Sequence, residues 1–429
     1  MKTKSSWAVI TGMAILALFL MVNLQPAIGQ QDTSKLVNLN GKLLDKESDE
    51  PLVFATVYLV GTTIGTVSNS DGEFILKIPF DLKDPKLGVK HIGYRNYSIP
   101  VSKLSEGELN EIKIQKEATN IKGIVVTQKD PEGLLRMALA KIPKNYSTEP
   151  VMMTGFYRET IKQNRSYVSI AEAVLNAYKS SYTKLIDEDR VKIYKGRKGE
   201  DLKKMDTVYF KFQGGPKTIF MLDVVKNPET LLSGEYMDYY TYKLSGVTTF
   251  NDKSCYMIDF DQKADVDNPL FKGTYYIDID NLAIAGVQFR LSDIGLAKAS
   301  EYLVKKKPSG MKVETVAANY LVNYTMNNNR WYLNYVRSEL KFRCKWPKHL
   351  FNSNYTIMAE MAVTDIDTAN LTKYKFSESA KMTDIFSDQV SAFFDKNYWG
   401  DYNFIKPDES IQVAIEKLSN KLRRRQATL

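Results

Sequence analysis

Histidine and cysteine are scarce in this chain. Its 429 residues include two histidines, His91 and His349, and two cysteines, Cys255 and Cys344. Neither histidine has a Glu three or four residues away, the spacing that pairs zinc ligands on one helix face. The sequence also lacks Gly-x-Ser-x-Gly, a glycine-rich phosphate loop and a dinucleotide-binding glycine pattern. No catalytic residue, metal site or cofactor is therefore predicted, and the protein is not expected to be an enzyme.

Two cysteines in a chain of this length exclude a fold built on disulfides. Cys344 continues an alternating apolar side with Val336, Leu340 and Phe342, which directs its thiol toward a core. A buried free thiol and a bridge to Cys255 both remain open. A nucleophilic pair of Cys344 with His349 is not expected, because the thiol faces inward.

Long hydrophobic runs are absent except at the beginning. Trp7 to Val22 is almost entirely apolar, follows Lys2 and Lys4, and precedes Ala27-Ile28-Gly29. This layout predicts a secretory signal peptide over residues 1–29, with an uncleaved anchor helix as the alternative. No cysteine follows that would accept a lipid, and no other segment reaches the length of a spanning helix. The mature protein is expected in the periplasm or associated with the outer membrane, without a transmembrane span.

Neither sign of charge forms long blocks, although the formal net charge is +9. The one dense basic cluster is residues 421–425. Export argues against nucleic acid as a partner. The cluster is therefore predicted to be a solvated tail, and contact with anionic envelope lipid or polysaccharide is the alternative.

What the chain does contain is β structure, with 26 Tyr and 19 Phe. Between about 150 and 380, long alternating segments are separated by short polar turns, which is typical of antiparallel strands. We predict a mainly β protein: a small β-sandwich, then a large antiparallel sheet or partial barrel with a few packed helices. The predicted parts are a signal peptide (1–29), a sandwich (36–116), a linker and helix (117–149), a β-rich domain (150–405) and a C-terminal helix with basic tail (406–429).

Capping and spacing predict three helices. One begins at Asp130 and Pro131, and another begins at Asp408. The third is predicted from apolar residues at helical spacing, namely Phe386, Val390, Phe393 and Phe394.

The stretch 66–76, TVSNSDGEFIL, has several oxygen-bearing side chains beside an apolar run. With Gly72 at position six of a calcium loop, Asn69 and Asp71 fit, but Val67 and Ile78 occupy positions that require ligands. Asp-Gly between alternating segments is instead a strong hairpin signal. We predict a hairpin turn without metal.

Glycines, turn residues and apolar positions recur at a characteristic spacing within residues 36–116. They are Gly41, Asp45, Pro51, Ala55, Val57, Gly61, Thr62, Gly65, Thr66, Asp71, Gly72, Phe74, Pro79, Gly93 and Tyr94. With these residues the region resembles the carboxypeptidase-like regulatory domain, a transthyretin-like, Ig-like β-sandwich widespread in exported proteins of the Bacteroidetes. The resemblance implies a fold and an exported location, but no enzymatic activity.

Later motifs include IPKNY, GFYRE, EAV, GTYYIDIDNLAI and YWGDYNFIKPDESIQVAIEKL. They resemble a Bacteroidetes family that carries such a regulatory-type domain at its N-terminus. This second resemblance implies no biochemical function.

Carboxylate pairs are the remaining route to catalysis. Asp278 and Asp280 share one face beside a predicted turn, where acidic residues are expected. A glycosidase would need two such groups on facing elements across a cleft. We favour the turn interpretation and keep a carboxylate-dependent hydrolase as an alternative.

A second carboxylate pair lies in the segment 153–179. A hairpin that turns at Asn164-Arg165 places Glu159 opposite Ile170 and makes Glu172 its diagonal neighbour, while Arg158 points to the other face. Both glutamates are expected to be solvated. Periodicity alone also permits a helix for the second arm.

Two segments read as strands, YMDYYTYKL and NRWYLNY, are rich in aromatic residues. Cross-strand packing accounts for such clusters. The alternative is a platform for sugar or peptide ligands, formed by Tyr236, Tyr239, Tyr240, Trp331, Tyr332 and Tyr335.

The leading hypothesis is a non-catalytic exported cell-envelope protein that binds or scaffolds through its β-rich domain. Its partner would be an envelope protein, a glycan or a lipid. The alternative is a periplasmic carrier of lipid or lipoprotein with a half-barrel cavity. A continuous apolar cavity would favour carriage, and a filled core would favour scaffolding.

Overall fold

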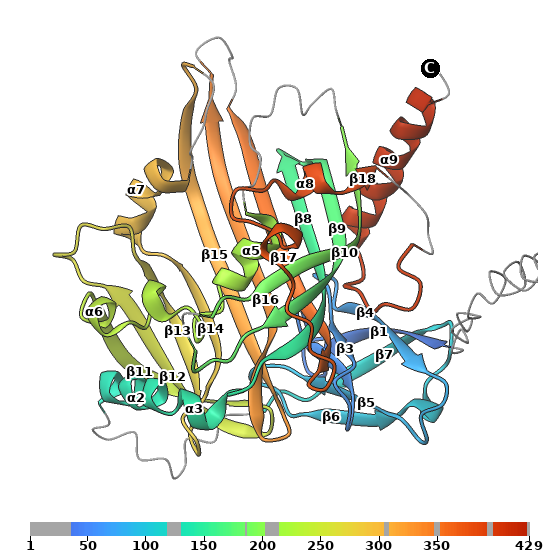
Figure 1. Cartoon of the computed structure of the whole chain (residues 1–429), viewed down its shortest axis with the longest axis horizontal. Coiled ribbons are helices and arrows are strands. Elements are labelled where there is room, and N and C mark those ends of the chain that lie inside the picture. Colours follow the sequence, from blue (N-terminus) through green and yellow to red (C-terminus); the bar gives the residue numbers. More distant parts are fainter. Residues whose placement is uncertain are drawn as a thin grey trace, which may run out of the picture.

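The computed structural model describes residues 36–117, 130–184, 187–201, 214–303, 309–346, 352–392 and 398–426. A small N-terminal sandwich lies beside a large open sheet, and short helices accompany the sheet (Figure 1). The predicted signal peptide, His349, Phe393 and Phe394 lie outside the described residues. None of the helices in the described ranges is long and apolar enough to cross a membrane.

The sandwich consists of two small sheets around a core of their own. One sheet has the order β4-β1-β7 and the other β3-β2-β5-β6. Buried apolar side chains, among them Leu39, Val57, Phe74 and Val89, form the core. The strands are β1 Leu36–Asp45, β2 Thr56–Leu59, β3 Gly65–Val67, β4 Glu73–Pro79, β5 Lys86–Lys90, β6 Tyr97–Pro100 and β7 Leu109–Ile114, with the short helix η1 Val101–Lys103.

The stretch 66–76 forms a tight turn but not a hairpin. Asn69 Oδ1 accepts hydrogen bonds from the backbone N–H of Asp71 and Glu73, at 2.9 and 2.8 Å. Gly72 has a φ of +75°, which favours glycine. The turn was predictable because this chemistry is local. The hairpin was wrong, because β3 pairs with β2 while β4 pairs with β1 in the other sheet.

Within the described residues, the main sheet has eleven strands in the order β11-β12-β13-β14-β15-β16-β17-β8-β9-β10-β18. The first ten are antiparallel to their neighbours, and the order ends without returning to β11, so the barrel is not closed. The mainly β prediction is confirmed. The bounds are β8 Val151–Gln163, β9 Ser166–Lys179, β10 Arg190–Glu200, β11 Tyr240–Phe250, β12 Lys253–Gln262, β13 Phe271–Asp278, β14 Ile284–Leu291, β15 Lys312–Asn327, β16 Arg330–Lys345, β17 Ser353–Asp367 and β18 Ser391–Ala392.

The helices are short except at the C-terminus. Asp130 caps α2 and Asp408 caps α9, as predicted. The helix predicted around Phe386 and Val390 is wrong, because α8 has four residues and leads into β18. The bounds are α2 Pro131–Ala140, α3 Ile142–Asn145, α5 Gly215–Met221, η2 Pro228–Thr230, α6 Gly234–Met237, α7 Asp293–Leu303, η3 Phe376–Glu378, α8 Phe386–Gln389 and α9 Glu409–Gln426.

Residue alternation gives the main sheet two distinct faces. Tyr335 and Arg337 of β16 point to the face that carries the sandwich, which we term the sandwich face. Val336 between them points to the helix face, where apolar side chains of the segment 214–237 fill the core. Cys255 and Cys344 are both buried and free, in two separate apolar clusters.

Candidate functional site

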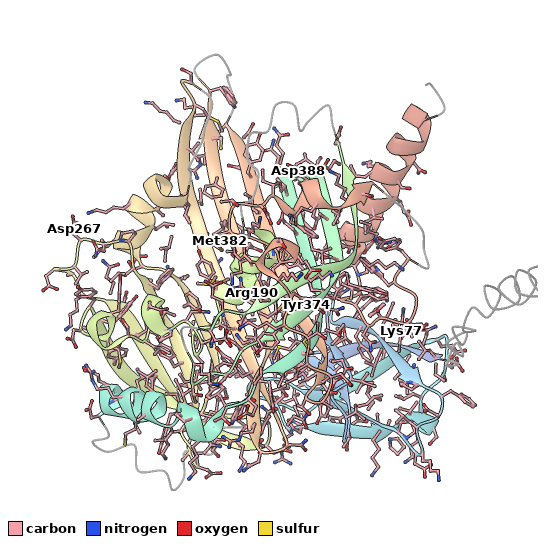
Figure 2. All side chains as sticks on the ribbon, viewed as in Figure 1. Lys77, Arg190, Asp267, Tyr374, Met382 and Asp388 are labelled. Carbon is pink, nitrogen blue, oxygen red and sulfur yellow. The ribbon has the colours of Figure 1, made fainter. Side chains whose placement is uncertain are left out.

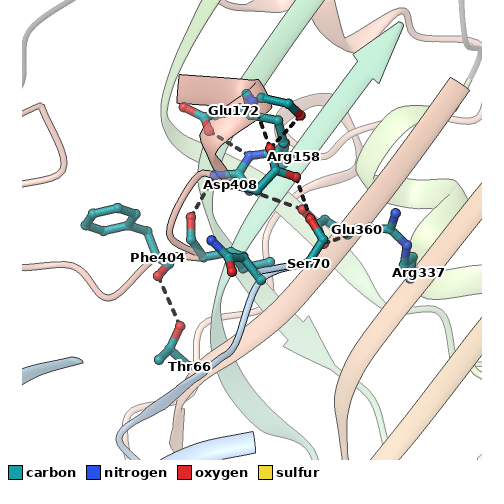
Figure 3. A network of polar contacts seen from close by, with 12 residues as sticks. Thr66, Ser70, Arg158, Glu172, Arg337, Glu360, Phe404 and Asp408 are labelled. Atoms are coloured by element: carbon teal, nitrogen blue, oxygen red, sulfur yellow. Dashed lines mark hydrogen bonds and ion pairs between the residues drawn. The ribbon is translucent and has the colours of Figure 1, made fainter. Parts of the chain in front are cut away.

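Five charged side chains form a row across five neighbouring strands of the sandwich face. They are Arg337 on β16, Glu360 on β17, Arg158 on β8, Glu172 on β9 and Arg197 on β10. Each stands directly opposite the next, so positive and negative groups alternate. We term this set the ion-pair row; Figure 3 shows its centre.

Each carboxylate of the ion-pair row lies between two guanidinium groups. Arg158 Nε donates to Glu172 Oε1 at 2.8 Å, and its Nη1 donates to Glu360 Oε1 at 3.2 Å. Arg197 Nε reaches the second oxygen of Glu172 at 2.8 Å, and Arg337 Nη1 reaches that of Glu360 at 3.2 Å. Burial opposes the charged form of Glu172, yet its two arginines hold its pKa below the ordinary value.

The ion-pair row corrects the predicted register of β8 and β9. The turn at Asn164 is in place, but the register shifts between Ile161 and Lys162, so Glu172 faces Arg158 and Glu159 faces Ala171. A one-residue shift moves side chains to the opposite face of a sheet. The two glutamates therefore lie on different faces. The expectation that they are solvated was also wrong, since they are 3% and 1% exposed.

The second arm of this hairpin is the strand β9, not a helix. It pairs with β8 on one side and β10 on the other, so both edges of its backbone are hydrogen-bonded within the sheet. Tertiary pairing therefore overrides the helical spacing of its apolar residues.

The C-terminal segment, residues 398–408, covers the ion-pair row. The carbonyl oxygen of Ile405 accepts a hydrogen bond from Arg158 Nη2 at 2.7 Å, and the Trp399 ring lies over Arg197 at 4.8 Å. At the other end of the row, Phe54 of the sandwich lies over Arg337 at 4.7 Å. The row is thus sealed by two parts of the chain that are far apart in sequence.

The stretch 66–76 connects the sandwich to this cover. Ser70 Oγ donates to Asp408 Oδ2 at 2.5 Å, and Asp71 Oδ2 accepts from the backbone N–H of Glu409 at 2.9 Å. The oxygen-bearing side chains of this stretch therefore hold the beginning of α9. Among the described residues, no group of three or more metal-binding side chains occurs here or elsewhere.

A groove of about 1070 Å³ continues from the ion-pair row, between the sandwich and strands β12–β16. Arg337 belongs to both, so the groove begins where the row ends. The sandwich side includes Val53, Phe54, Lys90, His91 and Ile92. The sheet side includes Asp259, Lys272, Thr274, Tyr276, Gln288, Arg290, Asn319, Leu321, Asn323 and Glu339.

The six aromatic residues predicted as a binding platform do not form one open surface. Tyr240, Trp331, Tyr332 and Tyr335 are buried, whereas Tyr236 and Tyr239 are half-buried. Tyr335 stacks on Phe54 at 5.6 Å and donates to Glu360 at 2.8 Å, so it supports the ion-pair row. Tyr236 lies in α6 rather than in a strand. Their burial supports the packing interpretation.

The predicted carboxylate pairs do not form catalytic pairs across a cleft. Asp278 is buried and accepts from the backbone N–H of Asp280 at 2.8 Å, which supports the turn interpretation. Glu159 lies on the helix face, where Tyr157 donates to it at 3.0 Å and burial raises its pKa to about 8. Glu172 is engaged in the ion-pair row on the opposite face. Glu159 and Glu172 therefore do not face a common cleft, and Asp278 and Asp280 belong to one turn rather than to two facing elements.

The comparison with known protein families concerns the N-terminal region. Residues 39–126 match the family described as CarboxypepD_reg-like domain, which confirms the resemblance of this part of the chain. The chain matches no curated protein.

Some solved structures resemble the chain in part. An outer membrane lipoprotein-sorting protein domain from Vibrio parahaemolyticus is 10% identical, with 57% of this chain and 96% of that chain covered and a TM-score of 0.26. A DUF1329 family protein from Desulfovibrio piger is 12% identical, with 58% and 99% covered and a TM-score of 0.24. A LolA superfamily protein from Nitrosomonas europaea is 7% identical, with 57% and 96% covered and a TM-score of 0.19. At these TM-scores the likeness carries no argument about function.

Proposed function

We propose that this protein is a non-catalytic, exported protein of the cell envelope that binds a ligand in the groove between its sandwich and its main sheet. The observation that carries the proposal is the groove, whose volume of about 1070 Å³ is at the upper end of ligand sites. The C-terminal segment contacts both walls, through Ile405 with Arg158 and Phe404 with Thr66, and Phe54 of the sandwich packs on Arg337 of the sheet. Preorganised walls reduce the entropic cost of binding.

The proposal is tested by recovering the protein from the envelope fraction and measuring its mass under native conditions. We expect a bound small molecule. Thr274, on the sheet side of the groove, is the residue to enlarge, and Thr274→Trp is expected to lose the adduct. Thr241→Trp, at an exposed site on β11, is the matched control and keeps the adduct.

Catalysis would contradict this proposal. Reproducible hydrolysis of a peptide, ester or glycoside by the purified protein would be the first indication of catalysis. Catalysis would be established if replacing one carboxylate by its amide lowered the hydrolysis rate about 10²–10⁴-fold while the circular dichroism spectrum stayed unchanged. The residues to replace are Glu159, Glu172, Asp278 and Asp280. A loss of that size exceeds what a mild structural disturbance produces.

A carrier of lipid or lipoprotein is the second candidate function. Its support is the apolar helix face, which the segment 214–237 covers. Carriage would require that segment to leave. The buried ion pair from Lys179 Nζ on β9 to Asp223 of that segment, at 2.8 Å, opposes this step. A fluorescent phospholipid that binds the wild-type protein, and binds Asp223→Asn more tightly, would favour carriage over a fixed scaffold.

Export is part of the proposal and has its own test. N-terminal sequencing of protein from the envelope fraction is expected to begin near Gln30. An intact Met1 would indicate an anchor helix instead.

A further inference from the structure

Lys90 is the cation of the groove that lacks a carboxylate partner within ion-pair distance among the described residues. Its Nζ lies over the Tyr58 ring at 4.4 Å. Desolvation lowers the pKa of Lys90, and Asp252 only partly opposes this effect. Asp252 is itself engaged, because it accepts hydrogen bonds from the backbone and side chain of Asn96 at 3.2 and 2.8 Å.

The other groove cations have acidic neighbours. Lys272 lies 2.8 Å and Arg290 3.6 Å from Asp293, and Arg337 is held by Glu360. An anion that enters the groove therefore meets Lys90 as the cation whose charge is least compensated. Pairing there would repay part of the desolvation of the ammonium group.

Asn323 provides a second, independent feature of the same groove. Its side-chain Oδ1 is buried and has no hydrogen-bond partner among the residues that the structure describes, and the residue is 7% exposed. Gly286 on β14 is the cross-strand partner of Asn323. If residue 286 had a Cβ atom, that atom would lie only 3.0 Å from Asn323 Oδ1 and 3.5 Å from Ile92 Cδ1. A buried acceptor without a partner is costly, so a ligand that donates to it gains a hydrogen bond with little competition from water.

The rest of the sheet side suits a ligand rich in hydroxyl groups. Gln288 and Asn319 offer a donor and an acceptor on each amide, and the Thr274 hydroxyl, which donates to Asp259 at 2.7 Å, can still accept a hydrogen bond. Tyr276 adds an aromatic ring beside these polar groups. Sugar rings present this combination, since their hydroxyls both donate and accept while their C–H faces pack against apolar surfaces.

We infer that the groove binds a carbohydrate with an anionic group, whose carboxylate or phosphate pairs with Lys90 and one of whose hydroxyls donates to Asn323. This inference rests on the proposed function of the groove as a ligand site. A soluble acidic oligosaccharide and the sugar headgroup of an acidic glycolipid share this chemistry. The charge pairing is screened by salt, so binding weakens as ionic strength rises.

The test is isothermal titration calorimetry with two trisaccharides that differ in charge, tri-galacturonate and galactotriose. We expect the acidic probe to bind at least about tenfold more tightly than the neutral one. Lys90→Met is expected to lose about tenfold or more of that affinity. The control is Lys86→Met, an exposed lysine on the same strand and outside the groove, which retains binding.

Asn323→Leu separates binding from folding. Because its Oδ1 is unpartnered without ligand, this nearly isosteric change is expected to leave the melting temperature unchanged or raise it, while affinity for tri-galacturonate falls. Vesicles that contain a glucuronosyl diacylglycerol distinguish a glycolipid headgroup from a soluble acidic oligosaccharide as the ligand. Binding to them but not to the soluble probe supports the headgroup, and the reverse result supports the free oligosaccharide.

Other results overturn the inference. Equal affinity for both trisaccharides, or full affinity in Lys90→Met, would refute the claim that the ligand carries an anionic group. If tetraglutamate bound as tightly as tri-galacturonate, the claim that the ligand is a carbohydrate would be refuted. Binding of no probe, soluble or in vesicles, would overturn the inference as a whole, whereas the proposed function is decided separately by the mass of the adduct and its loss in Thr274→Trp.

Discussion

At the scale of single residues, Arg158 at the centre of the ion-pair row has the largest expected effect on stability. Arg158→Met leaves Glu172 and Glu360 buried with one cation fewer each, and removing one partner of a buried pair costs about 3–5 kcal/mol. Urea denaturation measures the loss. The control is Arg343→Met, which breaks an exposed pair with Glu314 at 3.1 Å and is expected to cost about 0–1 kcal/mol. Equal losses in the two variants would refute a structural role for the row.

Glu159 makes a prediction about pH. Its pKa is about 8 in the folded protein, because burial raises it from 4.5, and Glu200 adds a smaller contribution. The folded state thus keeps a proton that the unfolded chain releases. The free energy of unfolding is therefore expected to fall between about pH 4.5 and pH 8, by up to about 1.4 kcal/mol per pH unit from this group.

Glu159→Gln removes that titration. Its free energy of unfolding is expected to vary less with pH across the same window, and to exceed that of the wild type at pH 8. Denaturation series at several pH values measure both effects. Glu314→Gln, at an exposed site, should retain the wild-type slope. An unchanged slope in Glu159→Gln would show that another group titrates.

At the scale of elements, the sequence indicated the strands of the main sheet but not their mutual register. The turn at Asn164-Arg165 was predictable from local chemistry, whereas the shift at Ile161 was not. That single shift decides whether Glu172 meets Arg158 or Glu159. The pairing of β17 with β8, which brings in Glu360, joins segments about 200 residues apart and leaves no local signal.

Two short stretches of the sequence do carry a signal of the ion-pair row. Glu172 and Glu360 each stand alone among apolar residues, in SIAEAVL and IMAEMAV. An isolated charge inside an apolar strand is buried only when it is paired, so such positions predict partners on neighbouring strands.

Asn403 of the C-terminal segment protects the edge of a sandwich sheet. Its Oδ1 accepts from the backbone N–H of Lys77 on the edge strand β4 at 2.7 Å, and its Nδ2 donates to the carbonyl of Lys77 at 3.4 Å. Lys77 is labelled in Figure 2. Asn403→Leu is expected to leave both backbone groups without these bonds and to cost about 1–3 kcal/mol.

Hydrogen exchange resolves this effect at a single amide. The Lys77 amide is expected to lose protection in Asn403→Leu, while the amide of Leu39, inside the same small sheet, keeps it. Protection at Lys77 that does not change would mean that Asn403 contributes nothing to this edge.

At the scale of the whole molecule, the sequence predicted each part better than their arrangement. The mainly β class follows from alternation, which is a local property. The placement of the sandwich against the main sheet depends on contacts between residues far apart in sequence, such as Thr66 Oγ1 with the carbonyl of Phe404 at 3.0 Å and Asn334 with Thr56 at 2.7 Å. The groove forms only because the sandwich is placed against the sheet in this way, so no sequence pattern could predict it.

The sandwich is nevertheless expected to fold alone. Its core lies entirely within the fragment 36–116, so the apolar burial that stabilises it is retained when the sheet is removed. The contacts with the rest of the chain are lost in the fragment, among them the packing of Val67 against Phe156 and Trp399, the Asn403 bonds to β4, and the Lys406–Glu73 ion pair at 2.6 Å. The fragment should therefore melt cooperatively but at a lower temperature than the sandwich within the full chain.

The same fragment tests whether the turn at 66–76 depends on metal. Its oxygen atoms are used by backbone N–H groups, as Asn69 shows, and the remaining contacts of Ser70 and Asp71 are to α9. Circular dichroism melts with and without EDTA should therefore coincide. A large drop in melting temperature with the chelator would establish a metal site. A fragment without a cooperative transition would mean that the sandwich needs the main sheet in order to fold, because the buried contacts of Val67 and the covered edge of β4 would then be indispensable.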